Sequence, residues 1–157
     1  MSLFEKIGED LKAAMKNKEQ ERISALRMVR TELLKKQKES ADVKMTDDLV
    51  VGVLQSLAKR YEESIEQFTT GGRDDLVQQE AAQLKIIQSY LPEKMSRDEI
   101  KSVVDAIIRE SGALSKRDFG KVMGQAMRKL KESPKLVDGS EVKEVVTSVL
   151  ENLEKGE

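Results

Sequence analysis

The chain of 157 residues contains no cysteine, histidine or tryptophan. Without cysteine it can form no disulfide and no thiolate metal site, and without histidine it lacks the usual general base of serine and cysteine hydrolases. We therefore expect no metal, no cofactor and no autonomous enzyme activity. Aromatic residues make up only 3% of the sequence and prolines number two, whereas Ala, Leu, Lys, Glu and Gln are abundant. This composition is typical of all-α proteins.

An excess of charge of one sign is also absent, because 28 Lys and Arg residues face 29 Asp and Glu residues. No global field attracts nucleic acid or a membrane, so any charged binding surface must be local. The first residues mix acids and bases, unlike a signal peptide, and no segment has the length and hydrophobicity of a membrane span. The sequence predicts a cytoplasmic protein with neither a membrane partner nor a DNA partner.

Apolar residues recur at three- and four-residue spacing in four segments before Pro92, the pattern of amphipathic helices. Together they predict a four-helix, bundle-like N-terminal domain over residues 1–92. The first of these helices is expected to start near Ser2, and the second to span about 19–38. The third is capped by Thr46 or Asp47 and stopped at Gly71 and Gly72, and the fourth spans 74–91.

The helical pattern restarts after Pro92. Ser96 and Glu99 form a capping-box sequence, and Gly112 marks the end of the helix that follows. A second box over 115–118 opens the next helix, and a last one spans about 140–153. The prediction is a smaller three-helix domain over residues 93–157.

The segment from Lys116 to Lys131, KRDFGKVMGQAMRKLK, places Gly120 and Gly124 inside an amphipathic helix. Each glycine costs about 1 kcal/mol relative to alanine there. A helical wheel puts Phe119, Met123, Ala126 and Leu130 toward the core, with Val122 and Met127 beside them. The opposite side forms a basic stripe around a gap in side-chain cover, made of Arg117, Lys121, Gly124, Arg128 and Lys131.

Such a gap between cations allows a phosphate backbone to approach the helix closely. Residues 116–135 hold seven bases and two acids, which makes this the most positive stretch of the C-terminal half. The alternative is that the glycines admit a neighbouring helix and the bases form a solvated face. The Asp118-Phe119-Gly120 triplet has none of the other protein-kinase motifs around it, so we assign Asp118 to the first helical turn.

Three charged residues of the N-terminal domain lie on apolar helix faces. Arg22 and Arg30 share the side of Leu26 in their helix, and Glu80 falls among Leu84 and similar residues in the fourth. We expect a buried ion pair between Glu80 and one or both arginines. The alternative is that the arginine stems reach past the apolar rim to water. Residues 12–38 also hold nine bases and three acids, which we interpret as an ordinary solvated face.

Two segments resemble a known family. The sequence over residues 70–100, TGGRDDLVQQEAAQLKIIQSYLPEKMSRDEI, resembles the helix, Tyr-Leu-Pro break and restart of the YqeY family, and Ser24-Ala25-Leu26-Arg27 also fits it. FGKVMGQAMRKLK, residues 119–131, resembles the motif that YqeY proteins share with the tail domain of GatB, the B subunit of tRNA-dependent amidotransferases. The resemblance implies an all-α N-terminal bundle joined to a smaller helical domain.

In the amidotransferases this tail contacts tRNA, while amide formation occurs in domains that the chain lacks. The resemblance therefore implies a non-catalytic tRNA- or RNA-binding accessory protein, with amidotransferase or aminoacylation assemblies as partners. Two alternatives are a helical protein-interaction module and a component of a carbon–nitrogen ligase, with glutamine as amido-N-donor, that acts only in complex. By position, the resemblance assigns Gly120, Lys121, Gly124 and Lys129 to the tRNA-facing motif, and the wheel adds Arg117, Arg128 and Lys131.

Overall fold

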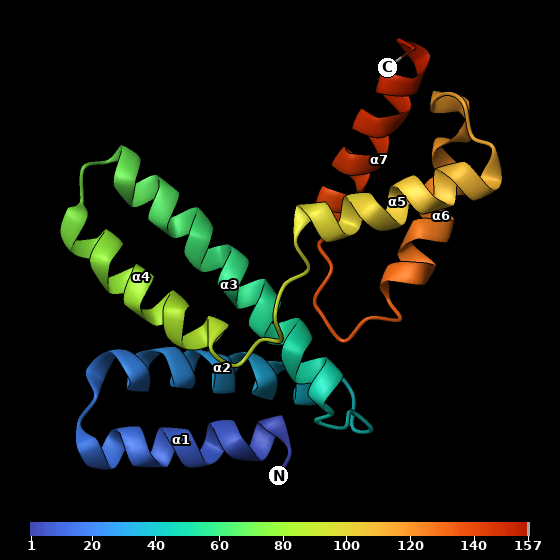
Figure 1. Cartoon of the computed structure of the whole chain (residues 1–157). Coiled ribbons are helices and arrows are strands. Elements are labelled where there is room, and N and C mark those ends of the chain that lie inside the picture. Colours follow the sequence, from blue (N-terminus) through green and yellow to red (C-terminus); the bar gives the residue numbers. More distant parts are fainter. Residues whose placement is uncertain (157) are drawn as a thin grey trace. The chain divides into compact units, whose positions relative to one another are not determined.

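The computed structural model describes residues 1–156, which form seven α-helices and one short 3-10 turn (Figure 1). No strand is present in these residues, so the all-α prediction is confirmed. The chain divides into two compact units, unit 1 over Met1–Leu91 and unit 2 over Pro92–Glu157. The helices of unit 1 are α1 Leu3–Asn17, α2 Gln20–Glu39, α3 Asp47–Thr70 and α4 Asp74–Gln88. Unit 2 contains α5 Arg97–Ser111, the turn η1 Lys116–Asp118, α6 Phe119–Leu130 and α7 Gly139–Glu154.

Local capping explains where these helices begin and end. The hydroxyls of Ser2, Thr46 and Ser96 each accept a hydrogen bond from the backbone N–H three residues later, at 3.1 to 3.2 Å. Gly112 ends α5 in the left-handed region, with φ of 70°. The fourth helix ends at Gln88, earlier than the predicted position, because the residues just before Pro92 form a tighter turn.

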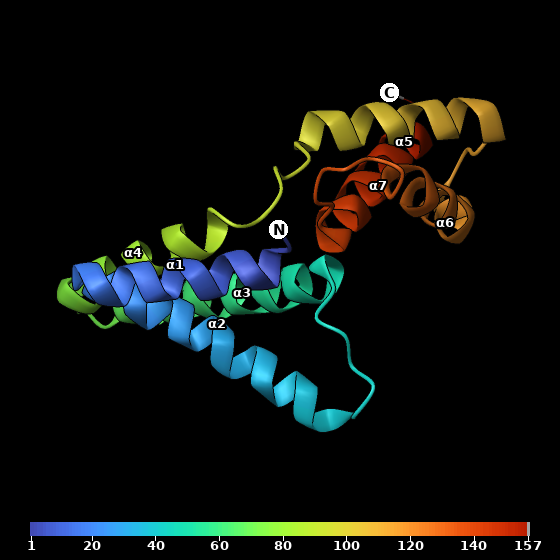
Figure 2. The same cartoon turned by 90° about the horizontal axis from the view of Figure 1, so that it is seen from below.

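In unit 1, α1 packs along α2 and α3 packs along α4, as both views show (Figures 1 and 2). The apolar stripes predicted from the sequence meet between them. The most deeply buried large side chains of this core are Leu26, Val29, Leu33, Val50, Leu54, Leu57 and Ile87.

In unit 2, α5, α6 and α7 pack around one apolar core. The segment before α5 and the segment after α6 are joined by two backbone hydrogen bonds. Met95 N–H donates to the Leu136 carbonyl at 2.7 Å, and Leu136 N–H donates to the Glu93 carbonyl at 2.8 Å. Lys135 Nζ donates to both carboxylate oxygens of Glu99 at 3.0 Å, which raises the pKa of Lys135 and lowers that of Glu99. The segment that follows α6 is therefore held at the start of α5.

The buried side of α6 is centred differently from the prediction. Val122 and Ala126 are fully buried and Leu130 is nearly so, whereas Phe119 and Met123 are only partly buried. The helical wheel gave the larger side chains the central position, but α6 packs against both α5 and α7, and its most deeply buried residues are Val122 and Ala126. This small rotation leaves the opposite side of α6 exposed.

The ion pair expected between Glu80 and the arginines is absent from residues 1–156, so that prediction is wrong. Arg22 instead lies 3.7 Å from the carboxylate of Asp10 on α1 and 4.0 Å from that of Glu19. Its side chain is 40% exposed, and Arg30 is exposed beside a groove of about 310 Å³ between α1 and α2. Both arginines reach water past the apolar rim, because α2 turns these positions toward α1 and not toward α4.

The buried polar residue of unit 1 is Gln83. Its amide oxygen accepts a hydrogen bond from Tyr61 Oη at 2.7 Å, and its amide nitrogen donates to Glu21 at 2.9 Å. Glu80 lies half-buried near this network, and burial together with the charge of Glu21 raises its pKa. Glutamine satisfies this buried site with one donor group and one acceptor and carries no charge of its own.

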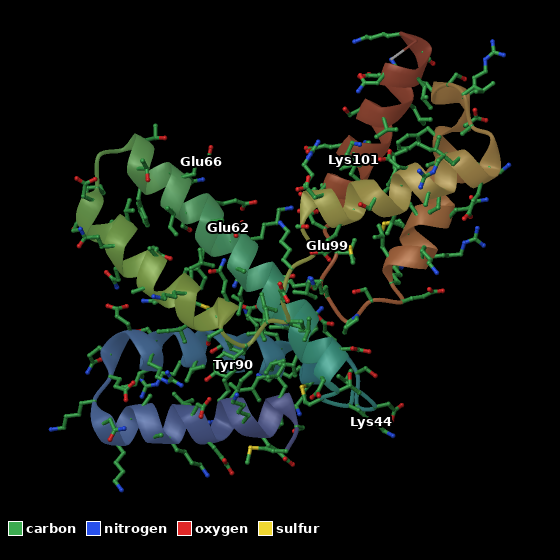
Figure 3. The ribbon with its side chains drawn as sticks, in the orientation of Figure 1. Lys44, Glu62, Glu66, Tyr90, Glu99 and Lys101 are labelled. Carbon is green, nitrogen blue, oxygen red and sulfur yellow. The ribbon has the colours of Figure 1, made fainter. Side chains whose placement is uncertain are left out.

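Tyr90 fastens the end of unit 1 to α1. Its hydroxyl donates to the Asp10 carboxylate that also faces Arg22, and Figure 3 labels the tyrosine beside these helices. Burial and the neighbouring carboxylate raise the pKa of Tyr90. The Tyr-Leu-Pro break noted in the sequence is thus also a tertiary contact.

Candidate nucleic-acid interface

The basic segment of unit 2 begins with a capped 3-10 turn. Ser115 and Asp118 form the predicted capping box, but the box caps η1, and α6 starts only at Phe119. The Asp118 carboxylate accepts hydrogen bonds from Leu114 N–H at 2.9 Å and Ser115 N–H at 3.3 Å. These bonds lower the pKa of Asp118 and give it a structural role. Arg117 therefore lies on η1 and not on the α-helical wheel.

Gly120 and Gly124 lie on the exposed side of α6. A Cβ atom added to either glycine would meet nothing within 4 Å, and neither has a positive φ. No contact within the described residues therefore requires a glycine at these positions. The main chain of α6 is open to an approaching molecule there, as the wheel predicted.

Seven bases lie between Lys116 and Lys135, and the structure separates them into two groups. Three are held by carboxylates at 3.0 to 3.2 Å, in the pairs Lys116 with Glu151, Lys129 with Glu132 and Lys135 with Glu99. The other four are exposed and have no carboxylate within 4.0 Å in residues 1–156. These four are Arg117, Lys121, Arg128 and Lys131. Together with Gly120 and Gly124, we call them the α6 basic face.

Among the residues of the predicted site, Lys129 lies on a different side of α6 from the two glycines. It lies roughly 140° around the helix axis from Gly124, and Glu132 neutralises it. It entered the prediction through the family motif, whereas the wheel had left it out. The motif and the geometry thus agree on Gly120, Lys121 and Gly124.

Arg128 is oriented by the open main chain. Its Nε donates to the Gly124 carbonyl at 3.3 Å, so the guanidinium lies along the edge of the gap. This is the one hydrogen bond of its side chain within residues 1–156, and the two terminal nitrogens of the guanidinium remain available. A planar guanidinium offered in this way matches two phosphate oxygens.

Sequence reasoning gave no role to Leu114. This side chain is 74% exposed in the loop between α5 and η1. Among the large hydrophobic side chains of residues 1–156, only Met1 is more exposed. Its position between the helix end at Gly112 and the cap at Ser115 is the signal in the sequence, because an apolar residue there belongs to no helix face.

The described residues contain no cluster of three or more Asp, Glu, His or Cys side chains arranged to bind a metal ion. In the same residues, none of the helices combines the length and the hydrophobicity that crossing a bilayer requires.

A family model described as Yqey-like protein matches residues 4–150. The chain belongs to the YqeY family. Curated relatives of this family member are called "Altered inheritance of mitochondria protein 41, mitochondrial". The protein of that name from Pyrenophora tritici-repentis is 32% identical over 78% of this chain and 67% of its own length. The one from Kluyveromyces lactis is 30% identical over 85% of this chain and 77% of its own length.

These names contradict the cytoplasmic location predicted from the sequence, because the relatives are named as mitochondrial proteins. The prediction rested on the absence of cysteine, of a signal-peptide pattern and of a membrane span. These features suit any reducing aqueous compartment, so they could not have separated one such compartment from another.

Proposed function

We propose that this YqeY-family protein is a non-catalytic accessory protein that binds RNA, and tRNA in particular, through the α6 basic face. The observation that supports it is the separation of the seven bases. Of the four without a carboxylate partner, Lys121, Arg128 and Lys131 lie on the side of α6 that carries Gly120 and Gly124, and Arg117 lies on the turn just before this helix. Cations in this arrangement gain more from phosphates than from any group of their own chain.

The geometry suits a phosphate backbone. Bare main chain at Gly124 permits close approach, and Arg128 lies along its edge while Lys121 and Lys131 flank it on the helix surface. Phosphate contacts of this kind fix position and supply affinity without reading sequence. The choice of tRNA within RNA comes from the resemblance of residues 119–131 to the tail domain of the amidotransferase B subunit. Amidotransferase or aminoacylation assemblies are the partners that this resemblance implies.

A second candidate is a protein-interaction module in which a partner helix lies over Gly120 and Gly124. The open space at both glycines favours it equally, but the four unpaired cations favour it less. Salt separates the two functions. RNA affinity falls steeply as salt rises, whereas a helix seated on small residues responds weakly.

The decisive experiment titrates bulk tRNA against the wild type and a Lys121→Glu, Arg128→Glu double variant in an electrophoretic assay. Each lost charge-assisted contact is worth about 1.4 kcal/mol, so we expect the double variant to bind about 100-fold more weakly. Both side chains are exposed, so the fold should be unaffected.

The matched control is Lys35→Glu, Lys36→Glu on α2, whose lysines pair with Glu32 and Glu39 at 3.1 and 3.6 Å. It makes the same change of net charge on another surface, and we expect tRNA affinity to stay within about threefold of the wild type. Equal retention of tRNA by the wild type and the α6 double variant would remove the proposed interface. Equal losses in both double variants would reduce it to a nonspecific effect of net charge.

A further inference from the structure

The loop between α5 and η1 holds its backbone firmly while leaving one apolar side chain in water. Gly112 ends α5 in the left-handed region, and Ala113 is buried in the core of unit 2. The N–H groups of Leu114 and Ser115 both donate to the Asp118 carboxylate. None of these contacts uses the side chain of Leu114, which is 74% exposed.

The next residue fixes the loop from the other side. Lys116 N–H donates to Glu154 on α7 at 2.8 Å, and Lys116 Nζ lies 3.2 Å from Glu151 on the same helix. The loop is therefore anchored to α5, to η1 and to α7. Because the backbone of this loop is already ordered, binding at Leu114 costs the rotamer freedom of the side chain but no further ordering of the main chain.

Leu114 lies beside the end of the α6 basic face. The Asp118 carboxylate that holds its backbone also interacts with the charge of Lys121, which contributes to the lowered pKa of Asp118. Arg117 lies on the same 3-10 turn as Asp118. The backbone of Leu114 is thus bonded to the turn that carries Arg117, which brings Leu114 within the span of a polynucleotide bound across Arg117 and Lys121.

We propose that Leu114 packs against an unstacked base of the bound RNA, so that this surface selects RNA with unpaired bases over continuous duplex. The inference rests on the proposed function. Faces of unpaired bases are apolar and accept aliphatic or aromatic side chains, whereas bases within a continuous duplex are covered by their neighbours. A duplex offers the same phosphates to the α6 basic face but nothing to Leu114.

The test compares bulk tRNA with a blunt-ended, fully paired RNA duplex of similar length at one salt concentration. Leu114→Ser is expected to weaken tRNA binding about tenfold and to leave duplex binding unchanged, with the same dependence of tRNA affinity on salt. Leu114→Met keeps an apolar side chain and should bind tRNA like the wild type. Leu34→Ser, which removes a leucine of α2 that is 47% exposed, controls for general loss of surface hydrophobicity and should change nothing.

Four outcomes separate this inference from the proposed function. If Leu114→Ser binds both probes like the wild type, Leu114 has no role and the α6 basic face stands. Equal losses on tRNA and duplex would overturn the selection of unpaired bases. A loss with Leu114→Met as large as that with Leu114→Ser would overturn the apolar contact. Failure of the wild type to retain either probe would remove the proposed function and this inference with it.

Discussion

The two units differ in where their polar side chains lie. In unit 1, Gln83, Tyr61 and Tyr90 are buried or nearly so, and each finds a hydrogen-bond partner on another helix. In the described part of unit 2, every buried side chain is apolar, and the open polar surface of α6 faces outward. Polar groups that are satisfied within the chain stabilise the fold, whereas exposed cations without an internal partner remain available to a ligand. The candidate interface that we propose lies on the exposed side of α6 in unit 2.

A second comparison concerns the two basic helix surfaces. Residues 12–38 contain more bases than residues 116–135, and only Arg22, Lys35 and Lys36 among them have a carboxylate within 4.0 Å in the described residues. Helix α2 contains no glycine, so side chains cover its main chain throughout. The open main chain at Gly120 and Gly124, rather than the number of unpaired bases, therefore distinguishes the α6 basic face from α2.

Filling the gap in side-chain cover on α6 tests directly whether the open main chain of this helix contacts RNA. Gly124→Leu puts a large side chain where nothing lies within 4 Å of the added Cβ, so phosphates are kept away from the main chain and Arg128 is displaced. We expect tRNA affinity to fall about tenfold, equivalent to about 1.4 kcal/mol, in the same electrophoretic titration. Helix propensity should at the same time raise the free energy of unfolding by about 0.5 to 1 kcal/mol.

Gly124→Ala is the matched control for that variant. It gains the same propensity but adds one methyl group only, so its tRNA affinity should stay within about threefold of the wild type. A Gly124→Leu protein that is more stable and binds tRNA normally would show that the open main chain is not a contact surface. Because stability and affinity are expected to move in opposite directions, unfolding cannot imitate the predicted result.

The fold followed from the sequence because its signals are local. Thr46, Ser96 and Gly112 each act within one helical turn, and their positions alone mark where helices begin or end. The open main chain at Gly124 was likewise predictable, since it depends only on the spacing of residues along one helix.

The pairing of charges did not follow from the sequence, because it depends on which helices become neighbours. Arg22 shares a helix face with apolar residues, but only the packing of α1 on α2 gives it Asp10 as its partner. The pair of Lys129 with Glu132 is the exception, because these residues lie three apart along the chain and their spacing alone predicts the contact. Periodicity assigns a residue to a side of its own helix and says nothing about what faces that side.

Removing the Tyr61 hydroxyl tests whether unit 1 depends on its internal polar network. In Tyr61→Phe the Gln83 oxygen loses its donor at 2.7 Å inside the core, and an unsatisfied buried acceptor costs about 1 to 3 kcal/mol. Urea titration should show this loss. Tyr90→Phe is the comparison, because Asp10 keeps Arg22 nearby and is partly exposed, so its loss should be smaller. Equal stability of Tyr61→Phe and the wild type would mean that water reaches Gln83.

The smallest expected effect concerns Glu80, where the pH dependence distinguishes a half-buried acid from an ion pair. Burial and the nearby Glu21 raise the pKa of Glu80 above its ordinary value of 4.5, so the folded state binds this proton more tightly than the unfolded state. Stability is then lost as pH rises from 4.5 through the folded-state pKa. Glu80→Gln should be more stable than the wild type at pH 7, by up to about 0.5 kcal/mol in urea titration, and the difference should vanish below pH 4.5. A paired Glu80 would give the opposite sign at pH 7, because its removal would leave an arginine without its partner.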